Sequence, residues 1–217
     1  MGTRFVFLGP PGAGKGTQAA LASELLKAPA IATGGIFREA MAKQTAMGKQ
    51  ITQFVNSGLL VPDKLTNAIV AERLSQGDCE RGFILDGYPR SLVQAKALDT
   101  FLTKGQKPLD RVLYFKVDAA LVVDRMGQRR ICGRCGATYN LVSQPPKDAG
   151  RCDKDQGELI TRTDDQPESI RKRLEVYEKT TSPLLKYYEK KSMLSVINAS
   201  LSVQDVAKAV SDICLAK

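Results

Sequence analysis

The chain has 217 residues, of which 43% are hydrophobic and 25% are charged, and its formal net charge is +9. This composition is typical of one substantial globular core, and no run approaches the ~18 apolar residues that a membrane span needs. Histidine is absent, so any mechanism that needs a histidine base, nucleophile or metal ligand is excluded.

Apolar, β-rich runs alternate with helical patterns along the chain. The runs are continuous, which predicts buried strands of a mainly parallel sheet. The expected strands are residues 4–8, 30–33, 82–86, 111–117 and 194–198. The expected helices are residues 16–26, 36–43, 63–76, 92–102, 119–127, 168–190 and 203–215, and Pro183 should kink or divide the long one. This alternation predicts a three-layer α/β fold around a central parallel sheet.

Two stretches depart from the alternation. Residues 34–61 are helical in pattern but intervene between strands without a single crossover helix. Residues 128–165 are rich in Cys, Gly, Pro and Asp and predict a small β-rich insertion. The expected division is a core at residues 1–31, 62–127 and 166–217, with insertions at residues 32–61 and 128–165.

The first expected strand runs into a glycine-rich phosphate loop. Residues 9–17 read Gly-Pro-Pro-Gly-Ala-Gly-Lys-Gly-Thr and match G-x-x-x-x-G-K-[ST] between a strand and a helix. The glycines allow a tight turn whose N–H groups face phosphate oxygens, and the helix adds its positive dipole end. Lys15 would contact the β- and γ-phosphates, and Thr17 would serve Mg²⁺. The residues expected to hold ATP here are Gly12, Ala13, Gly14, Lys15, Gly16 and Thr17.

A second motif, Asp86-Gly87-Tyr88-Pro89-Arg90, ends the third expected strand. Open α/β sheets bind ligands at the carboxyl ends of their strands. Asp86 is placed to hold Mg²⁺ or its water molecules, Arg90 can clamp a phosphate, and Gln94 can pair with a purine edge. The motif therefore predicts a second, phosphate-bearing substrate.

Three of the five cysteines lie in the 128–165 insertion. A C-x₂-C pair is followed, after 16 intervening residues, by a C-x₂-D pair, which is typical of a closed, structural zinc site. Asp153 is the alternative fourth ligand, and Gly133 and Gly136 suit the tight turn. Such a polar segment has little core of its own and needs a metal to hold it together. The expected ligands are Cys132, Cys135, Cys152 and Asp155.

Together, these motifs resemble those of the adenylate kinase family. The resemblance covers essentially the whole chain and extends through Thr33, Gly34, Arg38, Arg129, Arg162, Asp164, Asp165 and Arg173. The cysteine pattern is similar to the zinc-bearing lid of the long-form bacterial members. The resemblance implies a monomer that reversibly transfers a phosphoryl group from MgATP to AMP, giving two ADP. It also implies that residues 32–61 bind AMP and that residues 128–165 form the lid. Because the sequence shows no secretory signal and no transit stretch, we expect a cytoplasmic location.

The resemblance further implies which residues meet each nucleotide. Beyond the phosphate loop, ATP would meet Arg125, Arg129, Thr138, Tyr139 and Leu201. AMP would meet Thr33, Arg38, Leu59, Leu60, Val61, Gly87, Tyr88, Pro89, Arg90, Gln94, Arg162 and Arg173. The charge on the moving phosphoryl group would be stabilised by Lys15, Arg90, Arg129, Arg162 and Arg173. The family usually has Thr-Gly-Asp where this chain has Thr33-Gly34-Gly35.

Three other hypotheses compete with this one. Another nucleoside monophosphate kinase or a GTP:AMP phosphotransferase would share these motifs, although Thr33 and Gln94 favour adenine at the acceptor site and a long lid argues against the short-lid UMP/CMP kinases. A basic zinc-ribbon protein that binds nucleic acid would explain the net charge. That hypothesis predicts aromatic-rich basic surfaces, yet aromatic residues are only 6% and Trp is absent. We therefore expect neither a nucleic acid nor a membrane partner.

Overall fold

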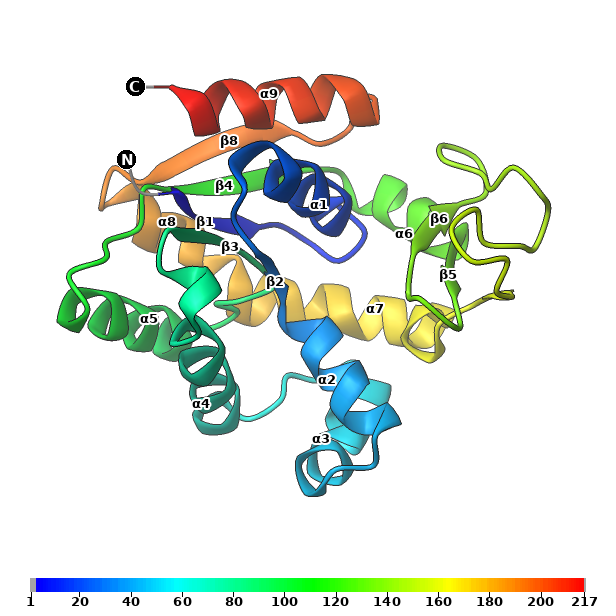
Figure 1. Cartoon of the computed structure of the whole chain (residues 1–217), viewed down its shortest axis with the longest axis horizontal. Coiled ribbons are helices and arrows are strands. Elements are labelled where there is room, and N and C mark those ends of the chain that lie inside the picture. Colours follow the sequence, from blue (N-terminus) through cyan, green and yellow to red (C-terminus); the bar gives the residue numbers. More distant parts are fainter. Residues whose placement is uncertain (1–2, 217) are drawn as a thin grey trace.

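The computed structural model describes residues 3–216, and its centre is a five-stranded parallel sheet (Figure 1). The strand order is β2-β3-β1-β4-β8, and every neighbouring pair is parallel. The strands are β1 (Thr3–Leu8), β2 (Ala30–Ala32), β3 (Gly82–Asp86), β4 (Arg111–Lys116) and β8 (Leu194–Asn198). The predicted central parallel sheet is confirmed.

Helices cover both faces of the sheet and complete the predicted three layers (Figure 1). One face carries α1 (Lys15–Leu26) and α9 (Val203–Leu215). The opposite face carries α4 (Asp63–Leu74), α5 (Leu92–Lys104) and α8 (Pro183–Glu189). Helices α2 (Thr33–Ala42) and α3 (Ala46–Asn56) lie within residues 32–61, and α6 (Ala119–Gly127) and α7 (Pro167–Val176) precede and follow residues 128–165.

Strand β1 shows why the apolar runs in the sequence are continuous. Phe5 and Phe7 pack into the cluster beneath α1 and α9. Val6 and Leu8 point the other way, into the cluster beneath α4, α5 and α8. Successive side chains of a strand face opposite sides, so a sheet covered on both faces needs apolar residues at every position.

The long C-terminal helical segment is divided, as Pro183 predicted. Helix α7 passes into a π-helical turn at Tyr177–Thr181, and α8 begins at Pro183. Proline lacks a backbone N–H and cannot continue the regular helical ladder, so the helix is interrupted just before it.

The two insertions have the expected secondary structure. Helices α2 and α3 pack on each other around a small apolar cluster that includes Phe37 and Ile51. The other insertion holds an antiparallel sheet of β5 (Arg129–Cys132), β6 (Thr138–Asn140) and β7 (Leu159–Ile160), in the order β6-β5-β7. Within residues 3–216, no helix combines the length and the apolar character that crossing a membrane requires.

Candidate active site

The phosphate loop connects β1 to α1 at the carboxyl edge of the sheet. Gly14 is the N-cap of α1 with φ of +85°, a conformation that residues with a Cβ rarely adopt. Gly12 has φ of +79°, and a Cβ there would lie only 2.8 Å from Cγ of Met126. No side chain caps the start of α1. The first N–H groups of the helix are therefore free to bind an anion.

Lys15 is folded back onto its own loop. Its Nζ donates hydrogen bonds to the carbonyl oxygens of Gly9 and Pro10 at 2.8 and 2.7 Å. Burial lowers the pKa of Lys15 to about 8, and Asp86 opposes this shift. The lysine is thus held above the loop without a carboxylate directly paired to it, ready to exchange carbonyl oxygens for phosphate oxygens.

Asp86 lies where β3 ends, beside the first turn of α1. A Cβ at Gly16 would lie 3.3 Å from Asp86 Oδ2, so glycine leaves room for the carboxylate to approach the loop. The chain then turns through Gly87, with φ of +76°, and a cis peptide bond between Tyr88 and Pro89. The turn follows directly after Asp86, whose carboxylate lies beside Gly16 of the phosphate loop.

Arg90 is anchored by the same turn. Its Nε donates to the Gly87 carbonyl oxygen at 2.7 Å. Burial lowers the pKa of Arg90, while Asp86 and Asp164 act to raise it. The terminal nitrogens of the guanidinium group are left to bind a phosphate.

Gln94 is 2% exposed, and its amide has a fixed orientation. Its Oε1 accepts a hydrogen bond from the Arg90 backbone N–H at 2.7 Å, and its Nε2 donates to Asp63 Oδ1 at 2.7 Å. Ser91 Oγ also donates to Asp63 Oδ1, at 3.0 Å. One N–H of Nε2 remains for a base edge. Sequence reasoning missed Asp63 because it lies 31 positions from Gln94 and belongs to no motif.

The 32–61 insertion is tied to this turn through Thr33. The Thr33 side chain is 1% exposed, and its hydroxyl donates to the Gly87 carbonyl oxygen at 2.9 Å. Arg38 lies over the start of its own helix, since a Cβ at Gly34 would be 3.1 Å from Arg38 Nη1. Burial lowers the pKa of Arg38 to about 10, and the charge of Arg162 acts in the same direction. Both side chains therefore lie close to the phosphate-binding groups.

Residues 59–61 pass from exposed to buried. Leu59 is exposed, Leu60 is half-buried, and Val61 packs into the small cluster of the insertion. Because Val61 is anchored in that cluster, the backbone beside it has a defined path. The structure thus leaves Leu59 and Leu60 accessible at the expected AMP position.

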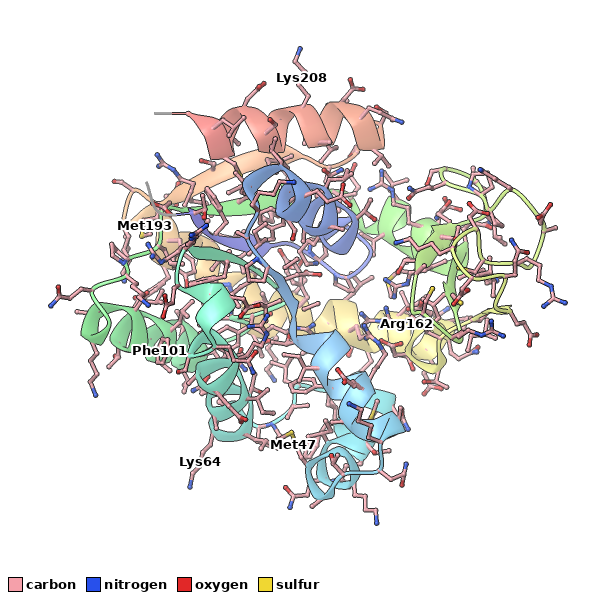
Figure 2. All side chains as sticks on the ribbon, viewed as in Figure 1. Met47, Lys64, Phe101, Arg162, Met193 and Lys208 are labelled. Atoms are coloured by element: carbon pink, nitrogen blue, oxygen red, sulfur yellow. The ribbon has the colours of Figure 1, made fainter. Side chains whose placement is uncertain are left out.

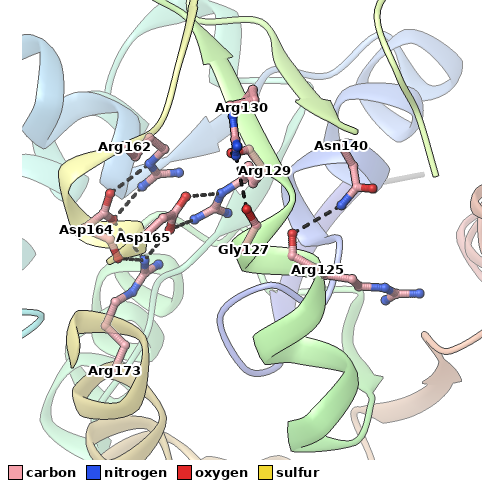
Figure 3. A network of polar contacts seen from close by, with 9 residues as sticks. All are labelled: Arg125, Gly127, Arg129, Arg130, Asn140, Arg162, Asp164, Asp165 and Arg173. Atoms are coloured by element: carbon pink, nitrogen blue, oxygen red, sulfur yellow. Dashed lines mark hydrogen bonds and ion pairs between the residues drawn. The ribbon is translucent and has the colours of Figure 1, made fainter. Parts of the chain in front are cut away.

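Two neighbouring acids gather three of the expected arginines (Figure 3). Arg162 binds Asp164 through Nε and Nη2 at 2.9 and 2.7 Å, and Arg129 binds both oxygens of Asp165. Arg173 bridges the pair, 3.0 Å from Asp164 Oδ2 and 3.2 Å from Asp165 Oδ1. Burial acts to raise the pKa of Asp164, but the guanidinium groups of Arg162 and Arg173 outweigh it and hold the pKa below its usual value.

Arg125 lies outside this network. Its Nη1 donates to the Ala199 carbonyl oxygen at 2.7 Å, and its side chain points away from the two acids (Figure 3). Asn140 of β6 donates to the Arg125 carbonyl oxygen at 3.2 Å. Leu201, which is exposed, follows Ala199 by two residues. Arg125 is therefore joined to the loop in which the sequence placed an adenine contact.

Lys15, Arg90 and the arginines bound to Asp164 and Asp165 lie close enough for their charges to influence one another's pKa. The charges of Arg90, Arg173 and Arg129 each lower the pKa of Lys15. Burial lowers the pKa of Arg173 to about 10, with Arg129, Arg162 and Arg90 adding to the shift. Figure 2 shows Arg162 near the start of α7. Such a cluster of positive charges attracts anions, and two phosphate-bearing nucleotides would neutralise it.

The lid brings together the four side chains that the cysteine pattern selected. One ligand atom from each of Cys132, Cys135, Cys152 and Asp155 lies within 4.8 Å of all the others. The two Sγ atoms of Cys135 and Cys152 are 3.6 Å apart, and two sulfurs bound at 2.3 Å to one tetrahedral ion would be about 3.8 Å apart. The donor set and its spacing fit a metal ion. Asp153, the alternative ligand, instead accepts a hydrogen bond from the Lys147 N–H at 2.9 Å.

The glycines of the lid differ in whether their backbone conformation or surroundings require glycine. Gly136 has φ of +73°, as a tight turn requires. Gly133 does not need to be glycine, because a Cβ there would meet its nearest neighbours at 3.7 Å. A Cβ at Gly157 would lie 2.7 Å from Cys132 Sγ and 3.0 Å from Asp155 Oδ1. Gly157 therefore shapes the metal group, and no spacing pattern in the sequence pointed to it.

The fold and this site define a P-loop phosphotransferase that accommodates two phosphate-bearing substrates. A family model described as adenylate kinase matches residues 7–193. The adenylate kinase of Thermosipho africanus is 50% identical over 208 residues, which cover 96% of this chain and 97% of the relative. Those of Archaeoglobus fulgidus and Bacillus subtilis are each 48% identical over 208 residues, covering 96% of both chains.

The chain belongs to the adenylate kinase family. This membership confirms the resemblance drawn from the sequence, the P-loop fold and the predicted activity as an ATP:AMP phosphotransferase acting on ATP, AMP and ADP. The nucleic-acid-binding hypothesis is set aside, because the family accounts for the phosphate loop, the second motif and the arginines together.

Proposed function

We propose that the chain carries out this transfer between the phosphate loop and the Asp86–Arg90 turn, using the cations that converge there. The observation that carries the proposal is the gathering of Arg129, Arg162 and Arg173 on Asp164 and Asp165. Two of these arginines, Arg129 and Arg173, are close enough to Lys15 to contribute to the lowering of its pKa. Phosphoryl transfer needs alignment and charge neutralisation more than covalent chemistry. Such a convergence supplies both.

On the donor side, the N–H groups of residues 12–17 hold the ATP phosphates, and Lys15 contacts the β- and γ-phosphates. Thr17 and Asp86 hold Mg²⁺ or its waters. Arg129 meets the triphosphate, and Arg125 supports the loop that carries Leu201. Backbone groups of Thr138 and Tyr139 flank the nucleotide. The residues proposed for ATP are Gly12, Ala13, Gly14, Lys15, Gly16, Thr17, Arg125, Arg129, Thr138, Tyr139 and Leu201.

On the acceptor side, Arg90 clamps the AMP phosphate and Gln94 pairs with the adenine edge, oriented by Asp63. Thr33, Arg38 and the backbone of residues 59–61 surround the rest of the nucleotide. An AMP phosphate oxygen attacks the γ-phosphorus, and the bond from that phosphorus to the β–γ bridging oxygen breaks, which leaves ADP at both sites. Charge that spreads over the moving group is stabilised by Lys15, Arg90, Arg129, Arg162 and Arg173.

The two acids of the network keep the arginines in place before substrate arrives. Arg162 uses Nε and one N–H of Nη2 on Asp164, and its remaining N–H groups are available to phosphate. Without Asp164 and Asp165, the buried guanidinium groups would repel one another and turn outward to solvent. The carboxylates therefore act as positioning residues rather than as bases.

The four-residue metal group of the lid is proposed to bind zinc. Thiolates and a carboxylate oxygen are donors that zinc accepts, and four protein ligands leave no open position for catalysis. The zinc role is structural. The insertions at residues 32–61 and 128–165 are proposed to close over AMP and ATP, which would exclude water and prevent simple hydrolysis. Monomeric state and cytoplasmic location stay predictions.

A coupled assay for ADP with AMP, UMP, CMP and GMP as acceptors tests the acceptor assignment. With MgATP as donor, kcat/KM for AMP should exceed that for the others by about 10²-fold or more. Gln94→Ala should narrow that preference and raise KM for AMP, with KM for MgATP unchanged, whereas the exposed control Gln204→Ala should change neither. Equal use of several acceptors by the parent protein would refute the role given to Gln94.

A further inference from the structure

The hydroxyl of Tyr139 lies inside the lid against a member of the metal group. Tyr139 is on β6, is 7% exposed, and packs in one cluster with Cys132 and Cys152. Its Oη is 3.3 Å from Cys152 Sγ. The same oxygen accepts a hydrogen bond from the backbone N–H of Asp153 at 2.8 Å. The phenol therefore joins the sulfur to the turn that follows it.

The direction of the contact with sulfur follows from these partners. A cysteine that binds a metal is a thiolate and carries no proton to donate. The Asp153 N–H occupies an acceptor position of the phenol oxygen, which leaves the O–H proton for the sulfur. With a metal bound, the contact is a hydrogen bond from Tyr139 to Cys152.

The two turns of the metal group differ in how their first sulfur is supported. Cys132 Sγ accepts backbone N–H groups from Arg134 and Cys135, at 3.3 and 3.4 Å. Cys152 Sγ accepts the Lys154 N–H at 3.4 Å and has the Tyr139 hydroxyl on another side. The Cys132 sulfur thus has hydrogen bonds from the backbone of its own turn, whereas the Cys152 sulfur also has the hydroxyl of Tyr139, which lies on a separate strand.

We propose that Tyr139 is a positioning residue of the lid metal group. Its O–H orients the Cys152 thiolate, and its hold on the Asp153 N–H fixes the turn that presents Asp155. Hydrogen-bond partners of metal ligands typically contribute a factor of 10–100 in affinity. The inference rests on the proposed function only in taking these four side chains to hold zinc.

Strand β6 also links this group to the phosphate-binding side. Tyr139 pairs with Arg130 of β5, and Asn140 pairs with Arg129. Strand β5 begins at Arg129 and ends at Cys132. One short ladder thus joins the strand of Tyr139 to the strand of Arg129. Any effect of the hydroxyl on catalysis would follow its effect on the metal.

Tyr139→Phe in the full chain tests the proposal by chelator competition for zinc. We expect the zinc affinity to fall by about 10-fold or more, with one ion still bound at saturation. Tyr188→Phe is the matched control, because Tyr188 Oη is buried and, among the described residues, has no hydrogen-bond partner. The control should keep the parent affinity.

A Co²⁺-loaded sample gives a readout that a simple packing role would not change. Loss of a hydrogen bond to a thiolate makes the sulfur a better electron donor, so the thiolate-to-cobalt charge-transfer band should move to lower energy in Tyr139→Phe and stay in place in Tyr188→Phe. Unchanged affinity and an unchanged band in Tyr139→Phe would overturn the inference alone. A parent protein that binds neither zinc nor cobalt would overturn the zinc assignment itself, and the inference with it.

Discussion

The phosphate loop and the lid differ in how much apolar core supports them. The loop is a short connection between β1 and α1, and both elements are embedded in a large apolar cluster that also includes β3, β4, β8 and α9. The buried cluster of the lid consists of Cys132, Tyr139 and Cys152, with Ala137 and Leu159 packed against it. One surface is held by the core of the protein, and the other by a small cluster around the metal group.

Because of this difference, we expect substitutions in the two regions to have different effects on activity and stability. Burial of apolar side chains stabilises the loop whatever it binds, so substitutions there should affect chemistry before they affect stability. The lid has too little apolar surface to order itself, so its order should depend on the metal group. The two regions can therefore be perturbed independently, each with its own readout.

The largest effect should come from Lys15→Ala. In the proposed mechanism Lys15 stabilises the transferring phosphoryl group, so its removal should lower kcat by about 10³-fold or more, as measured by ADP formation from MgATP and AMP. The melting temperature should not fall, because the large cluster remains intact and a buried charge is removed. Lys208→Ala is the control, since Lys208 projects from α9 away from the site (Figure 2). Near-normal turnover of Lys15→Ala would show that the loop does not serve as assigned.

The same lysine should make both the stability of the protein and its KM for MgATP depend on pH. Its folded pKa is about 8, below the ordinary 10.5, so the folded chain loses this proton before the unfolded chain does. In the ligand-free protein, stability should therefore gain a contribution as pH rises from about 8 to about 10.5. KM for MgATP should rise over the same range as the charge is lost. Lys15→Met should remove the stability contribution, and its persistence would assign it to another group.

The next effect concerns the lid and should leave the core intact. Gly157→Ala would place a methyl group 2.7 Å from Cys132 Sγ, so we expect the metal affinity to fall by at least about 10-fold, within the range for loss of ligand orientation. Gly133→Ala, in the other turn of the metal group, has space for the methyl group and should keep the parent affinity. Chelator competition measures both. Equal affinities would mean that the lid adjusts its backbone freely, contrary to the comparison.

The comparison also explains what could be predicted from the sequence. The strands, the phosphate loop and the metal group are encoded by local patterns: continuous apolar runs, glycines at fixed offsets and C-x₂-C spacing. Asp63 and Gly157 could not be found in this way. Asp63 acts on Gln94 from 31 positions away, and Gly157 matters because of the space between two turns. Neither contact exists until the chain has folded.

The roles of Asp164 and Asp165 fall between these cases. The family resemblance singled them out, but only the structure shows that they hold Arg129, Arg162 and Arg173 in one cluster. A sequence pattern can mark an acid near arginines. It does not show whether that acid binds a metal, transfers a proton or forms ion pairs with the arginines.

The smallest effect should come from Gly35→Asp, which restores the acid that the family usually has. A Cβ at Gly35 would meet only Ala32 Cβ, at an ordinary 3.7 Å, and the first turn of α2 has no acidic residue. Replacing a helical glycine and placing a negative charge near the helix N-terminus should together stabilise the fold by about 0.5–1.5 kcal/mol. The melting temperature should rise by about 1–6 °C, with activity kept or raised.

Gly35→Ala separates the two causes, because it removes the glycine without adding a charge. If the alanine variant is stabilised and the aspartate variant loses activity, the new carboxylate must compete with phosphate for Arg38 or its neighbours. That result would place residue 35 within reach of the substrate-binding cations. A gain in both variants would instead mean that the insertion tolerates either residue, since Thr33 fixes the start of α2 through its hydrogen bond to Gly87.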